Sequence, residues 1–141
     1  MAADLEQTTR RRTWIALIIW LTVIWTATSI PGRMLPEGPP GIDRVVHFAL
    51  YIPLGFLLVL ALAPSSGGCG CGLASMVVAL ATGAAMAALD EWHQQYIANR
   101  TASVGDWHWD LRGMIVGSVV ALLIVISRRR REHGRDPRRY R

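Results

Sequence analysis

The residue types best suited to chemistry gather in two polar stretches that border apolar segments of the chain. They supply five carboxylates, one imidazole, one phenol, one amide and one guanidinium group. The nine side chains of this candidate polar site are Asp43, His47, Tyr51, Asp90, Glu91, Gln94, Arg100, Asp106 and Asp110. Ionisable groups inside a membrane cost free energy unless they have partners, and they often mark functional sites. Their clustering therefore favours a functional site.

Three kinds of chemistry fit these residue types. Carboxylates beside a histidine can donate and accept protons as general acids and bases. A histidine with aspartate and glutamate can bind a divalent metal ion, and an arginine can bind a phosphate or a carboxylate. The spacing matches no metalloprotease, phosphatase or phosphate-loop motif, so the catalytic residues and any metal stay unassigned and no cofactor is expected. A buried ion-pair network that only holds helices together is the remaining alternative.

Helical spacing brings several of these side chains onto common faces. Asp43, His47 and Tyr51 follow one another at i, i+4 and i+8, and Asp106 and Asp110 are also four residues apart. Side chains at such intervals lie on one side of a helix. Asp43 comes directly after a glycine and an isoleucine and suits the N-cap of its helix, where its carboxylate would accept free backbone N–H groups.

Charged groups at membrane depth need partners of opposite charge. The chain offers Arg100 and Arg112 close to the acids. We therefore expect one of these arginines to pair with Glu91, Asp106 or Asp110.

Four apolar runs are the elements that must position the site. Residues 14–30, 45–63, 73–89 and 114–126 contain almost no charge, and the mean hydropathy of the chain is +0.29. About 20 apolar residues span a membrane as a helix, so we predict an all-α, four-helix transmembrane bundle over residues 13–127. The last run covers only about 20 Å at the helical rise, so the fourth helix must begin earlier, near Asp106.

Arginine is concentrated in the two ends of the chain and lysine is absent. Residues 10–12 precede the first apolar run, and an Arg-rich segment, residues 128–141, follows the last. The positive-inside rule then predicts that both termini are cytoplasmic and that the polar site faces the outer side. We expect residues 1–12 to be a disordered tail and the Arg-rich tail to contact anionic lipids, with no role in nucleic-acid binding. Cleavage of the first run as a signal peptide is the alternative.

Small residues indicate close helix packing. The third run is rich in alanine, glycine and serine, and Gly113 and Gly117 form a G-x-x-x-G pair in the fourth. Residues 64–72 read as a flexible linker on the inner side. Its two thiols, Cys69 and Cys71, have no second pair or histidine beside them, which argues against a zinc site.

An ordered set of motifs carries a resemblance to a known family. The set is Asp43-x-x-x-His47-Phe48-x-x-Tyr51, then Glu91-x-x-Gln94, then Arg100-x-x-Ser103-x-x-Asp106, then Gly113-x-x-x-Gly117. It resembles the VanZ-like family of small bacterial membrane proteins over roughly residues 14–126. One departure is Asp110, because the family usually has asparagine at this position.

The resemblance implies a multi-pass protein of the bacterial cell membrane. The founding member of the family is associated with low-level resistance to teicoplanin, a glycopeptide with an acyl tail, and does not remodel the peptidoglycan precursor. We therefore expect the site to bind an amphiphile or a lipid-linked ligand at the outer leaflet, in glycopeptide resistance or envelope homeostasis. The alternative is a membrane enzyme that acts on a lipid-linked substrate by acid–base or metal-assisted chemistry.

Overall fold

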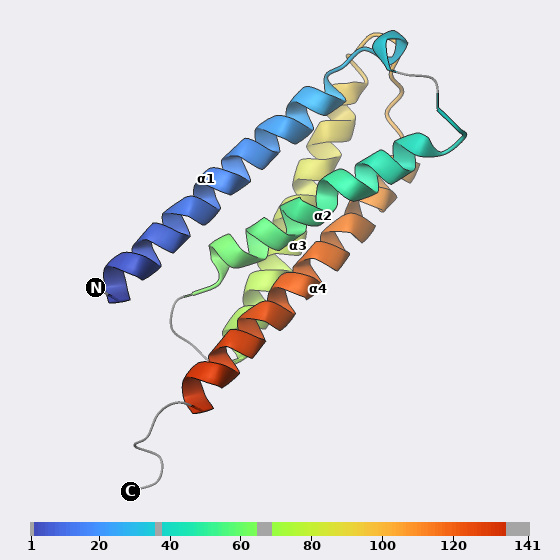
Figure 1. Ribbon diagram of the computed structural model, residues 1–141. Helices are drawn as coiled ribbons and strands as arrows, with labels where there is room; N and C mark the ends of the chain where they lie inside the picture. The colour runs from blue at the N-terminus through green and yellow to red at the C-terminus, as the bar shows by residue number, and fades with distance from the viewer. Residues whose placement is uncertain (1, 36–37, 65–68, 135–141) are drawn as a thin grey trace, which may run out of the picture.

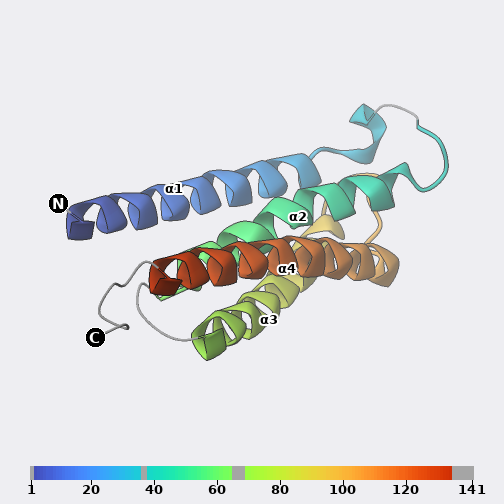
Figure 2. The same ribbon diagram turned by 60° about the horizontal axis from the view of Figure 1, so that its bottom comes forward.

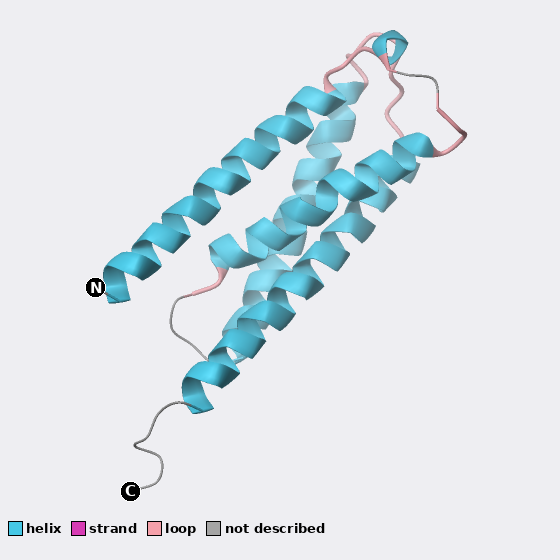
Figure 3. Cartoon of the chain, in the orientation of Figure 1, coloured by secondary structure: helices cyan, strands magenta, loops and turns pink. Residues whose placement is uncertain are grey.

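The computed structural model describes residues 2–35, 38–64 and 69–134, and this part of the chain is helical without strands (Figures 1 and 3). The elements are α1 Ala2–Thr28, a short 3-10 helix Gly32–Met34, α2 Ile42–Leu62, α3 Cys69–Gln94 and α4 Val104–Gly134. The four α-helices run in alternating directions, as the four apolar runs predicted. The all-helical, four-helix prediction is confirmed.

The two ends of the bundle are formed by different segments of the chain. The start of α1 and the end of α4 lie at one end, together with the end of α2 and the start of α3 (Figure 1). The other end carries the connections from α1 to α2 and from α3 to α4, which we call the loop end. α2 packs along α4, whereas α1 touches α2 and only slightly α3, so α1 lies apart from α4 (Figure 2).

Glycines allow α2 and α4 to approach until their backbones touch. Gly113 and Gly117 lie against the backbone of α2, and Gly55 lies against the backbone of α4. A Cβ atom on Gly117 would be 1.9 Å from the carbonyl oxygen of Ile52, a distance that no side chain tolerates. The G-x-x-x-G prediction is therefore confirmed, and this contact fixes the two helices that carry His47 and Asp110.

Apolar side chains fill the bundle and also cover its outside. The fully buried set includes Leu54 and Val59 of α2 and Met114 of α4, while Ile18 and Val77 are exposed on the surface. Three segments are long and apolar enough to cross a membrane, namely Ile42–Leu62, Gly72–Gln94 and Val104–Arg131. α1 is not among them, so its crossing of the membrane stays a prediction.

The helices are longer than the apolar runs. Residues 2–12, which we expected to be disordered, are the first turns of α1, because good helix formers such as alanine, leucine and arginine extend a helix that the apolar run nucleates. α3 begins at Cys69, inside the predicted linker, whose residues 65–68 lie outside the described part. α4 continues through Gly134 into the Arg-rich segment, and residues 135–141 are not described.

The capping prediction for Asp43 is wrong. The N-cap of α2 is Gly41, with φ of 87°, and no side chain caps this end. Glycine takes that left-handed conformation without the steric penalty of a Cβ atom. Asp43 instead lies in the first turn, where its carboxylate interacts favourably with the helix dipole. α4 begins at Val104, close to the predicted start.

Candidate functional site

The nine predicted site residues lie at the loop end of the bundle, but they are not equally enclosed. Six are buried, and these are His47, Tyr51, Asp90, Glu91, Gln94 and Asp110. Arg100 and Asp106 are half-buried, and Asp43 is exposed. The buried residues divide into two adjoining clusters, one around His47 and one around Asp90.

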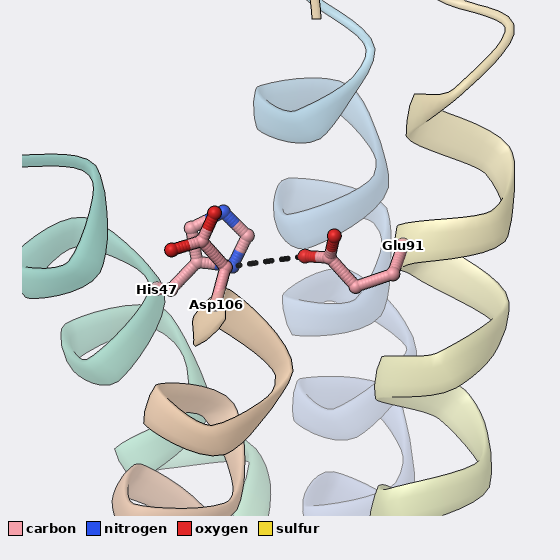
Figure 4. Close-up of side chains that lie close together, drawn as sticks. All are labelled: His47, Glu91 and Asp106. Atoms are coloured by element: carbon pink, nitrogen blue, oxygen red, sulfur yellow. Dashed lines mark ion pairs between the residues drawn. The ribbon is translucent and has the colours of Figure 1, made fainter. Parts of the chain in front are cut away.

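The histidine cluster consists of His47 of α2, Glu91 of α3, and Asp106 and Asp110 of α4. Nδ1 of His47 is 2.9 Å from Oδ1 of Asp110 and 3.8 Å from Oε1 of Glu91. Figure 4 shows the Glu91 side chain extending from α3 toward the imidazole. One donor atom from each of His47, Glu91 and Asp106 lies within 4.8 Å of the other two. Three helices therefore converge on one set of nitrogen and oxygen donors.

Two carboxylate oxygens of this cluster have no hydrogen-bond partner among the described residues. They are Oε1 of Glu91 and Oδ2 of Asp110, and both atoms are buried. The other oxygen of each carboxylate is fixed, because Oε2 of Glu91 accepts the N–H of Ser103 at 2.7 Å and Oδ1 of Asp110 contacts His47. A buried polar atom without a partner is rare and often marks a site for an ion or a ligand.

Ser103 positions Glu91 through the cap of α4. Its hydroxyl oxygen accepts the N–H of Asp106 at 3.3 Å, as an N-cap serine does three residues before the donor. The N–H of Ser103 itself then points to Glu91. Ser103 has no role predicted from the motifs, although a serine three residues before an acid at a helix start is a recognisable capping signal.

The second cluster centres on Asp90 and ties α1 to α3. Thr28 donates its hydroxyl to Oδ1 of Asp90 at 2.6 Å, and Nε2 of Gln94 donates to Oδ2 at 3.1 Å. Thr28 is a residue of this cluster that the sequence motifs do not predict. Nothing in its spacing separates it from Thr22 and Thr26, whose hydroxyls bond only to the backbone of their own helix.

The predicted pairing of an arginine with these acids is wrong. Nε of Arg100 donates to the carbonyl oxygen of Ile30 at 3.1 Å, and a terminal nitrogen donates to the carbonyl oxygen of Ala27 at 3.3 Å. The last carbonyl groups of a helix lack intrahelical partners and attract cations, so the end of α1 competes for this side chain. Arg112 lies over the ring of Trp109 on the exposed side of α4.

Two cavities of opposite character adjoin the clusters. The loop-end pocket, about 370 Å³, is bordered by both loops and by the side chains of Asp43, His47, Gln94, Arg100 and Asp106. The α1–α3 groove, about 380 Å³, is almost entirely apolar. It is lined by Ile18, Leu21, Thr22, Ile24 and Trp25 of α1, Tyr51 and Leu54 of α2, and Met86, Leu89 and Asp90 of α3. Both cavities have the size of small-molecule sites.

The sequence model of the VanZ/LLP1 family matches residues 5–125. The chain belongs to the VanZ/LLP1 family. This match extends from the first turns of α1 into the second half of α4 and includes every residue of both clusters, so the resemblance inferred from the motifs is confirmed. No curated protein and no solved structure matches the chain. Membership in VanZ/LLP1, with three helices able to cross a membrane, indicates a membrane protein in contact with lipid.

Proposed function

We propose that this VanZ/LLP1 protein binds an amphiphile, with the polar head group in the loop-end pocket and the apolar chain in the α1–α3 groove. One observation carries the proposal, namely that successive turns of the same two helices line the two cavities. His47 lines the pocket, and Tyr51, one turn further along α2, lines the groove. On α3, Gln94 lines the pocket and Asp90, one turn away, lines the groove. A molecule with one polar and one apolar end matches this division.

The size of each cavity limits the ligand. Volumes of about 370 and 380 Å³ lie at the lower end of the range of small-molecule pockets, about 300–1,000 Å³. The pocket suits a head group of the size of a phosphate or a single sugar, and the groove suits one hydrocarbon chain. A whole glycopeptide is too large for the pocket, so an acylated drug would engage the protein mainly through its tail.

The packing of α1 supports entry of the chain from the side of the bundle. α1 makes few contacts with α3, although the two helices form opposite walls of the groove. Ile18 and Leu89 line the groove and are also exposed on the outer surface. In a bilayer this surface faces lipid tails, so a chain can pass from the bilayer into the groove without crossing water.

The orientation in the membrane is part of the proposal. We infer that α1 also crosses the membrane and that residues 13–127 form a transmembrane unit of four helices. Residues 10–12 and 128–131 are arginines at the same end of the bundle. Positive flanks are retained on the cytoplasmic side, so both termini are cytoplasmic and the Arg-rich segment contacts anionic lipids. The site then opens toward the outer leaflet, with Trp107 and Trp109 at the interface.

A role in the bacterial envelope follows from this position. The protein would contribute to resistance against teicoplanin, or to envelope homeostasis, by holding an amphiphile at the outer leaflet. The susceptibility test compares teicoplanin with vancomycin, which lacks the acyl tail, in a sensitive Gram-positive host. The host expresses the wild type, Glu91→Gln or Asp106→Asn at matched membrane levels.

Protection against teicoplanin alone, lost in both variants, is the expected result. A groove variant sharpens the test. Leu89 and Leu123 are 58% and 59% exposed, but only Leu89 lines the groove. Leu89→Trp should therefore remove protection, and Leu123→Trp should retain it. Equal protection against both drugs, or no effect of any variant, would contradict a resistance role that depends on the site.

A membrane enzyme is the second candidate, because the histidine cluster adjoins the pocket that would hold the head group. His47 and Asp106 line this pocket, and Glu91 keeps a free oxygen beside them, as acid–base or metal-assisted chemistry on a lipid-linked substrate requires. Incubation of the wild type with a radiolabelled bacterial lipid extract discriminates the two. A new product that is absent with Glu91→Gln favours the enzyme, and lipid recovered unchanged favours binding.

A further inference from the structure

The histidine cluster holds more acid than the neighbouring cations can balance. Glu91, Asp106 and Asp110 surround a single imidazole. Within the described residues the ion pairs of Glu91 and Asp110 are with His47 alone, and Asp106 forms none. The nearest arginine in the pocket, Arg100, donates to carbonyl groups of α1. Buried charges in proteins are paired or coordinate metals, because an unpaired charge is expensive to remove from water. A bound cation would therefore balance the excess negative charge of the cluster.

The donor atoms are close enough to share one ion. The donors of His47, Glu91 and Asp106 lie within 4.8 Å of one another. Ligands held about 2.0–2.2 Å from Zn²⁺ are about 3–4 Å apart, so small side-chain rotations bring the three atoms into a coordination sphere. Figure 4 shows these side chains approaching from three separate helices, α2, α3 and α4.

Glu91 is already arranged as a ligand. The residue is 7% exposed, and its Oε1 has no hydrogen-bond partner in the described part of the chain. This oxygen faces His47, while the N–H of Ser103 holds Oε2 (Figure 4). A carboxylate with one oxygen anchored and the other free is the arrangement found when the anchoring group orients a metal ligand.

Asp110 plays the corresponding part for His47. Its Oδ1 lies 2.9 Å from Nδ1, so the carboxylate accepts the Nδ1–H and leaves the lone pair on Nε2 for a cation. Oε1 of Glu91 lies 3.8 Å from the same Nδ1, so the Glu91 side chain must rotate toward Nε2 to share that cation. Metal-binding histidines usually donate their other N–H to a carboxylate or a carbonyl group, which fixes the ring. Asp110 contacts His47 and does not belong to the group of three donors, so it acts through His47 as a positioning residue.

We propose that His47, Glu91 and Asp106 bind one divalent cation, Zn²⁺ or Mn²⁺, with Asp110 orienting the imidazole. One nitrogen and two carboxylate oxygens suit these metals better than Ca²⁺ or Mg²⁺, which prefer oxygen ligands alone. Three protein ligands leave a coordination position free, and His47 and Asp106 both border the loop-end pocket. That position binds an anionic oxygen of the head group, a step that rests on the proposed amphiphile function.

Metal content is the direct test. The full chain, with Cys69→Ser and Cys71→Ser to remove thiol ligands, is purified in detergent and stripped with a chelator. It is then titrated separately with zinc and manganese chloride, without added amphiphile, and retained metal is measured by mass spectrometry after desalting. We expect one equivalent of one metal. Asp110→Asn should weaken binding about 10–100-fold, the cost of losing a residue that orients a metal ligand.

Removal of a ligand should abolish stoichiometric binding. Glu91→Gln and Asp106→Asn are the test variants, and His47→Gln has a matched control in His108→Gln, because His108 is exposed on α4 and does not belong to the metal-binding group. Circular dichroism and size-exclusion chromatography establish that each variant is folded. The proposal is overturned if the wild type retains neither metal, or if the ligand variants bind as tightly as His108→Gln.

The metal result is separable from the proposed function. The titration contains no amphiphile, so one equivalent of bound metal supports the cation site even if no amphiphile binds. Adding a lipid with a phosphate head group, with and without chelator, tests the free coordination position. At least tenfold weaker lipid binding with chelator is expected, and equal binding in both would contradict the role of the cation in holding the head group.

Discussion

Replacement of Gly117 by alanine tests whether the α2–α4 contact holds the site together. The added Cβ atom would lie 1.9 Å from the carbonyl oxygen of Ile52, and real Cβ atoms stay at least 3.0 Å from such neighbours. The two helices must therefore separate by about 1.1 Å at this point. The atom that is in the way belongs to the backbone of α2, so no side-chain rotation can relieve the contact.

The expected cost follows from two opposing effects. Overpacking a tight core costs about 1–3 kcal/mol, and a backbone contact justifies the upper end of that range. Alanine is favoured over glycine inside a helix by about 1 kcal/mol, which offsets part of the loss. We therefore expect Gly117→Ala to lower the free energy of unfolding by about 2 kcal/mol.

A second glycine provides the matched control. A Cβ atom on Gly83 would also be 1.9 Å from its neighbour, but this neighbour is the terminal methyl group of Met114, which can move. Gly83→Ala should therefore cost little or nothing. Unfolding of both variants is measured by circular dichroism in mixed micelles with increasing dodecyl sulfate. Equal stabilities of the two variants would refute the argument that backbone contact fixes α2 against α4.

Three further predictions address the surroundings of the site. Thr28→Val should cost about 1–3 kcal/mol of unfolding free energy, since it removes the 2.6 Å hydrogen bond to a buried carboxylate, whereas Thr22→Val should change it by less than about 0.5 kcal/mol. Arg100→Gln should cost about 1–2 kcal/mol because two carbonyl groups of α1 lose a charged donor, and it should speed proteolysis between α3 and α4. A cysteine at Thr101 should react with a membrane-impermeant thiol reagent added to intact cells, as the proposed orientation requires.

Each of these predictions has an outcome that contradicts it. A loss as large for Thr22→Val as for Thr28→Val would mean that the bond to Asp90 contributes nothing of its own. Arg33 is exposed, so an equal loss for Arg33→Gln and Arg100→Gln would remove the specific role of Arg100 at the end of α1. Labelling at Thr101 only after the cells are broken would reverse the orientation and move the site to the cytoplasmic side.

Much of the fold and part of the site could be predicted from spacing alone. Uncharged runs of membrane length fix the number of helices, and short connections make them alternate in direction. The interval of four residues between His47 and Tyr51 places both on the inner face of α2, where both are buried. The glycine pair at 113 and 117 predicted a close contact because only a missing side chain allows two backbones to touch.

The remaining contacts depend on groups that a sequence pattern does not reveal. The arginine at 100 binds backbone carbonyl groups, which every residue carries, so no residue type could indicate its partners. Thr28 differs from the other threonines of α1 only by facing Asp90 across 62 positions of sequence. The polarity of residues 2–12 predicts disorder, but a helix already formed extends through residues of high helix propensity.

The most direct test of the account is native mass spectrometry of the detergent-solubilised chain with three matched probes. Oleoyl lysophosphatidate carries the head group and one chain, glycerol 3-phosphate carries only the head group, and mono-oleoylglycerol lacks the phosphate. We predict a one-to-one adduct with lysophosphatidate alone, reduced at least tenfold in Leu89→Trp and unchanged in Leu123→Trp. Equal adducts in both tryptophan variants, or equal binding of all three probes, would contradict a site that holds the head in the pocket and the chain in the groove.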